Sequence, residues 1–242
     1  MSKSIAVLGA GPGLGQAVAR RYGREGYAVG LIARRRESLD KLADSLTNAG
    51  VSAHAIPADL ADPVGIPALV EQIRARVGEP DAIYYGPTAG TLVPVSELTA
   101  EHVHAVMPSA VYSLLALVEA FLPRMREQRD GAIMVATGAS AVRGMRNVSG
   151  PGPALAAQRN YLQSLEAELA DTGVYVGRLY IGAAIEGSAW HARLRADEAA
   201  GRSTRGGGPT VDPGELADLL WTMHHSTRQP ESVVPDGILD GL

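Results

Sequence analysis

The apolar positions of this chain follow two different periods in alternation. Runs of consecutive apolar residues predict buried strands, whereas apolar residues spaced three or four positions apart predict amphipathic helices. The predicted strands lie at residues 5–8, 28–33, 51–58, 82–85, 131–137, 174–181 and 232–234. The predicted helices lie at residues 14–22, 37–49, 63–77, 100–129, 154–172 and 190–200, with a last one from residue 213. Such alternation is typical of βαβ units, so we expect helices on both faces of a parallel sheet.

Three segments interrupt this regular alternation. Pro108 and Pro123 fall inside the predicted helix at residues 100–129 and are expected to bend or end it. Residues 138–153 are rich in glycine, serine and proline and are predicted to form a loop. Residues 183–211 are polar and glycine-rich, and we expect them to form a mobile flap. The 242 residues otherwise follow one continuous pattern, which predicts a single, doubly wound α/β domain over residues 1–242.

A glycine-rich stretch joins the first predicted strand to the first predicted helix. It reads Gly9-Ala10-Gly11-Pro12-Gly13-Leu14-Gly15 and follows the apolar run at residues 5–8. Glycines let the backbone approach a ligand closely, and a helix N-terminus favours negative charge. A tight turn without a ligand is the alternative, but the flanking strand and helix favour a dinucleotide site. We expect Gly9, Gly11, Pro12, Gly13, Leu14 and Gly15 to contact this cofactor.

Arginines follow the second predicted strand, where a carboxylate would hold the ribose 2′-hydroxyl of NAD(H). Ala33 occupies that position, and Arg34-Arg35-Arg36 come directly after it. A guanidinium pairs bidentately with phosphate, so Arg34 and Arg35 favour NADP(H) over NAD(H). Solvated arginines at a helix start are the alternative, but cations in a first turn are unfavourable unless an anion compensates. Asp59-Leu60, after the third strand, is expected beside the adenine ring, or else contains an ordinary loop aspartate.

The composition of the chain limits the classes of binding partner and of catalytic group that we expect. The formal net charge of −4 and the isoelectric point near 5.9 predict no nonspecific binding of nucleic acid or anionic membrane. The chain contains no cysteine, which excludes disulfides, thiolate metal sites and a cysteine nucleophile. No histidines have metal-ligand spacing, so no metal site is expected. We find no charged and apolar leader and no apolar run of about 20 residues, and therefore expect a cytoplasmic protein with no membrane partner.

Taken together, these motifs resemble the short-chain dehydrogenase/reductase family over nearly the whole chain. The matching residues are Gly9, Gly13, Gly15, Arg34, Asp59-Leu60, Leu122-Pro123, Ser164-Leu165-Glu166-Ala167-Glu168-Leu169 and Gly173-Val174-Tyr175-Val176. The resemblance implies a Rossmann-like sheet of about seven strands, NAD(P) binding and assembly as a homodimer or homotetramer through the long helices. It also implies that Gly86, Pro87, Ile181 and Gly182 contact the cofactor.

The family's usual catalytic motif is missing from this chain. Family members carry Tyr-x-x-x-Lys at the start of the helix before the sixth strand, where this chain has Pro151 and Leu155. Neither side chain donates a proton, and the only lysines, Lys3 and Lys41, lie in the first βαβ unit. In the family the lysine lowers the tyrosine's pKa, so that the tyrosine exchanges a proton near neutral pH. The resemblance therefore predicts an atypical, divergent member.

Hydroxyl groups near the carboxyl ends of the strands are the candidate replacements, because ligands bind there in open parallel sheets. Ser140 and Tyr85 are the first candidate catalytic residues, followed by Ser149 and Tyr180. The serines are alternatively loop hydroxyls bonded to backbone, and Tyr180 is alternatively a packing residue. His191, in the predicted flap, is a further candidate or else a surface histidine.

Two functions fit these observations. The first is an NADP(H)-dependent oxidoreductase that transfers hydride to a small-molecule carbonyl, enone or imine with a nonstandard proton donor. The second is a nicotinamide-cofactor-binding protein without redox turnover, acting as a sensor, a partner subunit or a scaffold for a non-redox reaction. Both hypotheses predict binding of NADP(H), and only the first predicts oxidation of NADPH.

Overall fold

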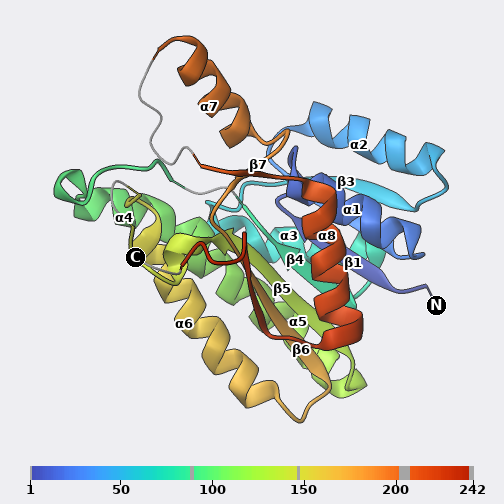
Figure 1. Cartoon of the computed structure of the whole chain (residues 1–242). Coiled ribbons are helices and arrows are strands. Elements are labelled where there is room, and N and C mark those ends of the chain that lie inside the picture. The colour runs from blue at the N-terminus through green and yellow to red at the C-terminus, as the bar shows by residue number, and fades with distance from the viewer. Residues whose placement is uncertain (1, 88–89, 146–147, 202–207, 240–242) are drawn as a thin grey trace.

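In the computed structural model, a seven-stranded parallel sheet lies between two layers of helices (Figure 1). The structure describes residues 2–87, 90–145, 148–201 and 208–239. The strands are β1 (Ser4–Leu8), β2 (Ala28–Ala33), β3 (Ala53–Pro57), β4 (Ala82–Tyr85), β5 (Gly131–Gly138), β6 (Val174–Ile181) and β9 (Glu231–Val234). Their order across the sheet is β3-β2-β1-β4-β5-β6-β9, and each neighbouring pair is parallel. The predicted doubly wound α/β sheet is confirmed.

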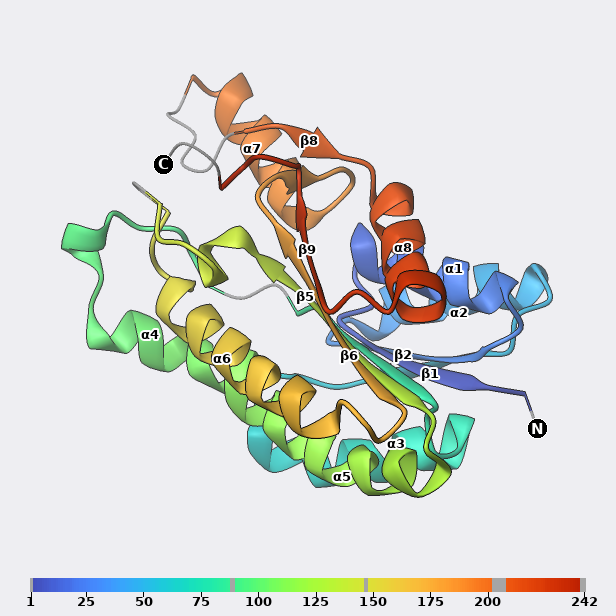
Figure 2. The ribbon, with the colours of Figure 1, turned by 60° about the horizontal axis from the view of Figure 1, so that its bottom comes forward.

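Successive strand side chains point to opposite faces, and each face is covered by its own helices. Helices α1 (Leu14–Arg24), α2 (Arg36–Asn48) and α8 (Pro213–Thr222) pack on the face that carries Ile5 and Val7. Helices α3 (Ile66–Val77), α5 (Ser113–Gln128) and α6 (Gly152–Leu169) pack on the face that carries Ala6 and Leu8 (Figure 2). Because both faces are covered, the strands are predominantly apolar, which made them recognisable in the sequence.

The long helix predicted at residues 100–129 is divided by a wider turn. Helix α4 (Ala100–Met107) passes into a π-helical turn at Pro108–Tyr112, which then continues as α5. The carbonyl oxygens of Ser109 and Ala110 accept hydrogen bonds from the Tyr85 hydroxyl and the Gln158 amide, respectively. Pro108 therefore coincides with a change of helix type, as expected. Pro123, in contrast, lies within α5 without ending it.

The segment from Ala100 to Gln128 is long and apolar enough to cross a membrane by length and composition alone. Half of its most apolar 18-residue window is buried inside the protein. Leu114, Leu117 and Phe121 belong to the core that faces α3 and α6. Its apolar character is thus that of a core helix in this fold.

The two predicted irregular segments contain more regular structure than the sequence indicated. β5 extends to Gly138, a 3₁₀ turn follows at Ala139–Ala141, and α6 begins at Gly152, where a nearby proline is compatible with a first helical turn. In the predicted flap, β7 (Ala184–Ile185) pairs in parallel with β8 (Thr210–Val211), and α7 (Ala189–Ala199) lies between them in sequence. Residues 202–207 of the flap lie outside the described residues.

Candidate functional site

The glycine-rich stretch turns sharply after β1 and leads into α1. Gly9 and Gly13 have φ angles of 103° and 96°, a conformation that other L residues rarely adopt. A methyl group at Gly9 would stand 2.6 Å from the Gly86 carbonyl oxygen, and one at Gly15 would overlap the Gly9 carbonyl oxygen. A methyl group at Gly11 would meet nothing within 4 Å. The loop is therefore tightly packed on its inner side and open at Gly11.

Arg34 and Arg35 lie beside this glycine loop because the loop is bonded to the end of β2. The backbone N–H groups of Gly9 and Ala10 both donate to the Ile32 carbonyl oxygen at 2.9 Å. Both arginine side chains are exposed, and within the described part of the chain neither forms an ion pair. Two uncompensated guanidinium groups thus stand next to a helix N-terminus, an arrangement that attracts phosphate.

The remaining predicted residues of this half of the site differ in exposure. Pro12 is exposed, whereas the Leu14 and Leu60 side chains are buried and contribute to the two cores. Asp59 is exposed, and its Oδ1 accepts a hydrogen bond from the Ala61 N–H at 3.0 Å. Asp59 therefore forms the local turn that the sequence left open as an alternative to binding the adenine ring.

The other half of the predicted site lies at the ends of β4 and β6. The predicted residues there, Gly86, Pro87, Ile181 and Gly182, are all partly exposed. The Gly182 N–H donates to the Val234 carbonyl oxygen at 2.7 Å, which fixes the end of β6 against β9. Because carboxyl ends of parallel strands share one edge of the sheet, these residues and the glycine loop face the same side.

The flap contributes a second helix N-terminus to the glycine loop. A methyl group at Gly13 would stand 3.1 Å from the Ser188 Cβ and 3.4 Å from the Ile185 Cγ2. Gly13 is the N-cap of α1, and Ser188 is the N-cap of α7, where its Oγ accepts from the His191 N–H at 3.1 Å. The N-termini of α1 and α7 therefore lie next to each other, which the sequence did not predict.

Tyr85 does not face this site, contrary to the sequence-based prediction. Its side chain is fully buried in the core between the sheet, α3 and α5. Its hydroxyl donates to the Ser109 carbonyl oxygen in the π-helical turn, and burial raises its pKa. A buried phenol already bonded to backbone contradicts a role as proton donor. Tyr85 instead stabilises the turn between α4 and α5.

Ser140 lies where the sequence placed it, directly after β5. It is half-buried in the 3₁₀ turn at Ala139–Ala141. A methyl group at Gly138 would stand 3.4 Å from the Ser140 Oγ and 3.6 Å from the Leu155 Cδ1. The hydroxyl of Ser140 and the side chain of Leu155 therefore flank the same stretch of backbone.

The other two hydroxyl candidates are held by different contacts. Ser149 is half-buried, and its backbone N–H donates to the Val93 carbonyl oxygen at 3.1 Å. Tyr180 is buried, and its hydroxyl donates to Glu231 Oε1 at 3.1 Å. Burial, with the nearby Glu231 carboxylate, raises the pKa of Tyr180 to about 12. Tyr180 is therefore a packing residue, as the alternative interpretation held.

An apolar cluster lies around the two positions, Pro151 and Leu155, that the family resemblance aligns with the Tyr-x-x-x-Lys motif. Its buried members are Val106, Ala110, Val111, Ala141, Ala154, Leu155 and Tyr180. Pro151 is also buried, and a methyl group at Gly90 would stand 3.3 Å from its Cβ. The surroundings of Leu155, next to Ser140, are thus mainly hydrocarbon.

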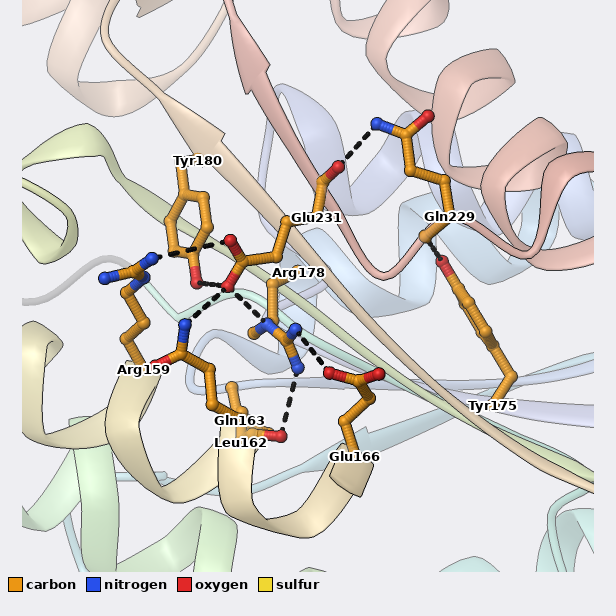
Figure 3. A network of polar contacts seen from close by, with 9 residues as sticks. All are labelled: Arg159, Leu162, Gln163, Glu166, Tyr175, Arg178, Tyr180, Gln229 and Glu231. Atoms are coloured by element: carbon orange, nitrogen blue, oxygen red, sulfur yellow. Dashed lines mark hydrogen bonds and ion pairs between the residues drawn. The ribbon is translucent and has the colours of Figure 1, made fainter. Parts of the chain in front are cut away.

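A network of polar contacts fixes β6 to α6 and β9 (Figure 3). Arg178 on β6 is 2% exposed. It donates from Nε to Glu231 Oε1 at 3.0 Å, from Nη2 to Glu166 Oε2 at 3.1 Å and from Nη1 to the Leu162 carbonyl oxygen at 3.0 Å. A buried guanidinium needs such partners because an unpaired buried charge is strongly destabilising.

Glu231, the first residue of β9, is the acceptor that joins this network together. Besides Arg178, its side chain accepts hydrogen bonds from Gln163 at 3.1 Å and from Arg159 at 3.4 Å. Burial opposes the charge of this carboxylate, but the two guanidinium groups outweigh burial and lower the pKa of Glu231. The network positions β9, the last strand of the sheet.

Two histidines lie at the opposite, amino edge of the sheet. His224 is buried, its Nδ1 lies 3.1 Å from the Tyr22 hydroxyl, and its ring stacks on Tyr175. The neighbouring His225 stacks on Trp221 with ring centroids 3.6 Å apart. Burial lowers the pKa of His224 to about 3, with a further contribution from His225. These histidines belong to the packing between α1, α8 and β6.

Residues 3–197 match the family model described as short chain dehydrogenase. Among curated proteins, a 1-deoxy-11-beta-hydroxypentalenate dehydrogenase of Streptomyces exfoliatus is 28% identical over 94% of this chain and 81% of its own length. A fatty acyl-CoA reductase of Mycobacterium tuberculosis is 34% identical over 54% of this chain. The match spans 46% of the length of that relative, so less than half of it is compared.

Solved structures show the same fold at low sequence identity. L-sorbose reductase from Gluconobacter frateurii, complexed with NADPH and L-sorbose, superposes with a TM-score of 0.82 at 23% identity, over 100% of this chain and 98% of the other. An actinorhodin polyketide ketoreductase variant with NADPH superposes with a TM-score of 0.83 at 23% identity, over 98% and 97%.

Proposed function

The chain belongs to the short-chain dehydrogenase family, and on that premise we propose that it is an oxidoreductase that uses NADP(H) to transfer hydride to a small-molecule carbonyl, enone or imine. The observation that carries the proposal is the meeting of the glycine loop, Arg34 and Arg35, and the N-termini of α1 and α7 at one edge of the sheet. Relatives named as dehydrogenases and reductases, and similar folds holding NADPH, support it.

The residues present fit a dinucleotide phosphate. Gly11 leaves open space above the loop, and Gly13 meets Ser188 so that two helix N-termini favour the pyrophosphate. The guanidinium groups of Arg34 and Arg35 can pair bidentately with a ribose 2′-phosphate, the group that distinguishes NADP(H) from NAD(H). Since these arginines follow β2, the nicotinamide end extends to the other side of β1, over the ends of β4 to β6.

Ser140 is the side chain that we propose to contact substrate. When bound, the reduced nicotinamide supplies the hydride that adds to the electrophilic carbon. The Ser140 hydroxyl, half-buried after β5, donates a hydrogen bond to the substrate heteroatom, and water delivers the proton to that atom. General acid catalysis contributes typically about 10²–10⁴-fold, so a site without a strong acid favours substrates that are already activated, such as enones and imines.

The decisive experiment mixes the purified protein with NADPH and a panel of ketones, enones and imines. The expected result is binding of NADPH by calorimetry and its oxidation by at least one class in the panel. Absence of NADPH binding would contradict the proposal outright. Binding without oxidation by any class would favour the second function, a cofactor-binding protein without turnover, for which the apolar cluster around Leu155 and Ala110 is the supporting observation.

Replacing Arg34 tests the choice of NADP(H). We expect Arg34→Ala to weaken NADPH binding by about tenfold or more, because a hydrogen bond to a charged group is worth about 1.5–3 kcal/mol. Binding of NADH, which lacks the 2′-phosphate, is expected to stay unchanged. Arg36→Ala is the matched control, since Arg36 is the first residue of α2 and equally exposed. Equal losses for NADPH and NADH in calorimetry would contradict the assignment.

The outer face of α5 supports a proposal about assembly. Tyr112, the last residue of the π-helical turn that precedes α5, and Leu115, in the first turn of α5, are large apolar residues that are 45% and 38% exposed. A hollow farther along α5 is lined by Glu119, Leu122, Pro123, Arg126 and Glu127. In an antiparallel pair of α5 helices centred near residues 122 and 123, Glu119 of each chain would face Arg126 of the other. The residues lining this hollow are thus complementary to a second copy of themselves, as a two-fold interface requires. We propose a homodimer through α5.

Charge reversal on α5 tests this assembly. Arg126→Glu would place four carboxylates at the centre of the interface, and like charges in contact weaken association. We expect light scattering to give twice the 25.2 kDa chain mass for the unmodified protein and a shift toward 25.2 kDa for the variant. The double variant with Glu119→Arg is expected to restore the larger mass. The same mass for the unmodified protein, the single variant and the double variant would rule out this interface.

A further inference from the structure

Residues 235–239, which we name the strap, leave β9 and cross the carboxyl ends of β6 and β5. A methyl group at Gly182 would stand 2.6 Å from the Ile238 Cγ1 and 3.4 Å from the Ala139 Cβ. Ile238 therefore packs directly on the backbone at the end of β6, beside the turn that carries Ser140. The absence of a side chain at Gly182 creates the space that Ile238 fills.

Contacts at both ends hold the strap in place. At its start, β9 is fixed by the hydrogen bonds of Glu231 with Arg178 and its neighbours (Figure 3). At its end, the Arg143 Nη1 donates to the Leu239 carbonyl oxygen at 3.0 Å. Within the strap, the Ile238 N–H donates to the Pro235 carbonyl oxygen at 3.3 Å. The position of Ile238 is therefore fixed by these hydrogen bonds as well as by the packing of its own side chain.

This position is at the reacting end of the proposed site. The arginines after β2 mark the phosphate end of the cofactor, so the nicotinamide end lies over β4 to β6, where Gly182 and Ser140 are found. Ile238 is half-buried and apolar, and it covers Gly182 from outside. A substrate group reaching the space beside Ser140 therefore meets the apolar cluster of Leu155 on one side and the strap on the other.

We propose that Ile238 is a specificity-determining residue whose side chain limits the size of the substrate group next to the reacting carbon. The proposal rests on the proposed oxidoreductase function. Ile238→Ala removes three side-chain carbons. The space for a bulky substrate substituent becomes larger, and a small substituent loses contacts. One methylene in an apolar pocket changes selectivity by roughly 10–200-fold, so the effect of Ile238→Ala is measurable.

The experiment compares two substrates of the class that the protein turns over, one with a methyl and one with a phenyl substituent. We expect Ile238→Ala to raise the phenyl-to-methyl ratio of kcat/KM by about tenfold or more, with NADPH binding by calorimetry unchanged. Val64→Ala, at a side chain that is 88% exposed, is the matched control and should leave the ratio unchanged. Arg143→Ala, which frees the end of the strap from the surface, is expected to change the ratio in the same direction.

The outcomes separate this proposal from the one it rests on. An unchanged ratio in both Ile238→Ala and Arg143→Ala, with NADPH still oxidised, would overturn the role of Ile238 alone. Failure of the unmodified protein to bind or oxidise NADPH would overturn the proposed function, and the specificity role with it. If Ile238→Ala does not fold, Ile238→Val and Arg143→Ala provide the same comparison.

Discussion

Gly15→Ala is expected to destabilise the protein and to abolish or strongly weaken NADPH binding. The added methyl group would overlap the Gly9 carbonyl oxygen and stand 2.9 Å from the Ala10 Cα, and both neighbours are backbone atoms. Because no side chain can turn away, α1 has to move from the end of β1. Overpacking of this kind costs typically about 1–3 kcal/mol of unfolding free energy, measurable by urea denaturation. Movement of α1 also displaces the N–H groups proposed to bind pyrophosphate, so we expect NADPH affinity to fall by at least about tenfold.

Gly11→Ala provides a control within the same loop. Gly11 has open space around it, so its substitution is expected to change stability by less than about 0.5 kcal/mol. If the pyrophosphate lies over this loop, the methyl group instead weakens NADPH binding without changing stability. Equal stability of Gly15→Ala and Gly11→Ala would contradict the packing argument. Undiminished NADPH affinity in both variants would contradict the position assigned to the cofactor.

The sequence predicts the sheet well because the central strands β2, β1, β4, β5 and β6 are largely buried on both faces. β2 and β6 were predicted with the bounds that the structure shows, because each is a predominantly apolar run that ends where the strand leaves the core. The last helix was likewise predicted to begin at residue 213, where α8 begins, and Asp212 Oδ1 caps it by accepting hydrogen bonds from the Gly214 and Glu215 N–H groups. These features are local, so neighbouring residues suffice to reveal them.

The candidate site was harder to predict where it depends on contacts between distant segments. Tyr85 ends a strand at the correct edge, yet alternation along β4 turns it toward α5, where it bonds Ser109. A π-helical turn leaves no clear sequence signal, so nothing indicated that this carbonyl needed a donor. The approach of Ser188 to Gly13 and of Ile238 to Gly182 joins residues 175 and 56 positions apart. Such contacts follow only from the closed fold.

The carboxyl edge of the sheet and the core near β6 differ in how polar their side chains are. At the carboxyl edge, Pro151 and Leu155 occupy the positions that the family resemblance aligns with the tyrosine and lysine, and apolar residues pack around Leu155. In the core, the charge of Arg178 is matched by Glu166 and Glu231. Charged side chains are therefore found where they join β6 to α6 and β9, whereas the surroundings of Leu155 are mainly hydrocarbon.

The buried imidazole of His224 makes the protein sensitive to moderate acid. Burial and the neighbouring His225, together with Arg228 and Lys3, lower its pKa, and the Asp130 carboxylate only partly opposes them. The Tyr22 hydroxyl and the stacked Tyr175 ring complete its surroundings. The folded protein holds His224 with a pKa of about 3, against an ordinary value of 6.5. The unfolded chain therefore binds one more proton than the folded protein between these two pH values.

We expect the stability contributed by neutral His224 to be complete above pH 6.5 and to be lost as the pH falls toward 3. One proton changes the unfolding free energy by about 1.4 kcal/mol per pH unit, so about 3 kcal/mol is lost between pH 6.5 and 4. His224→Gln cannot titrate, and its urea midpoint should fall less steeply with acid than that of the unmodified protein. His104→Gln, at an exposed position on α4, is the matched control and should follow the unmodified protein. Parallel curves for all three proteins between pH 4 and 7 would mean that His224 is protonated in the folded state, which its packing between Tyr22 and Tyr175 opposes.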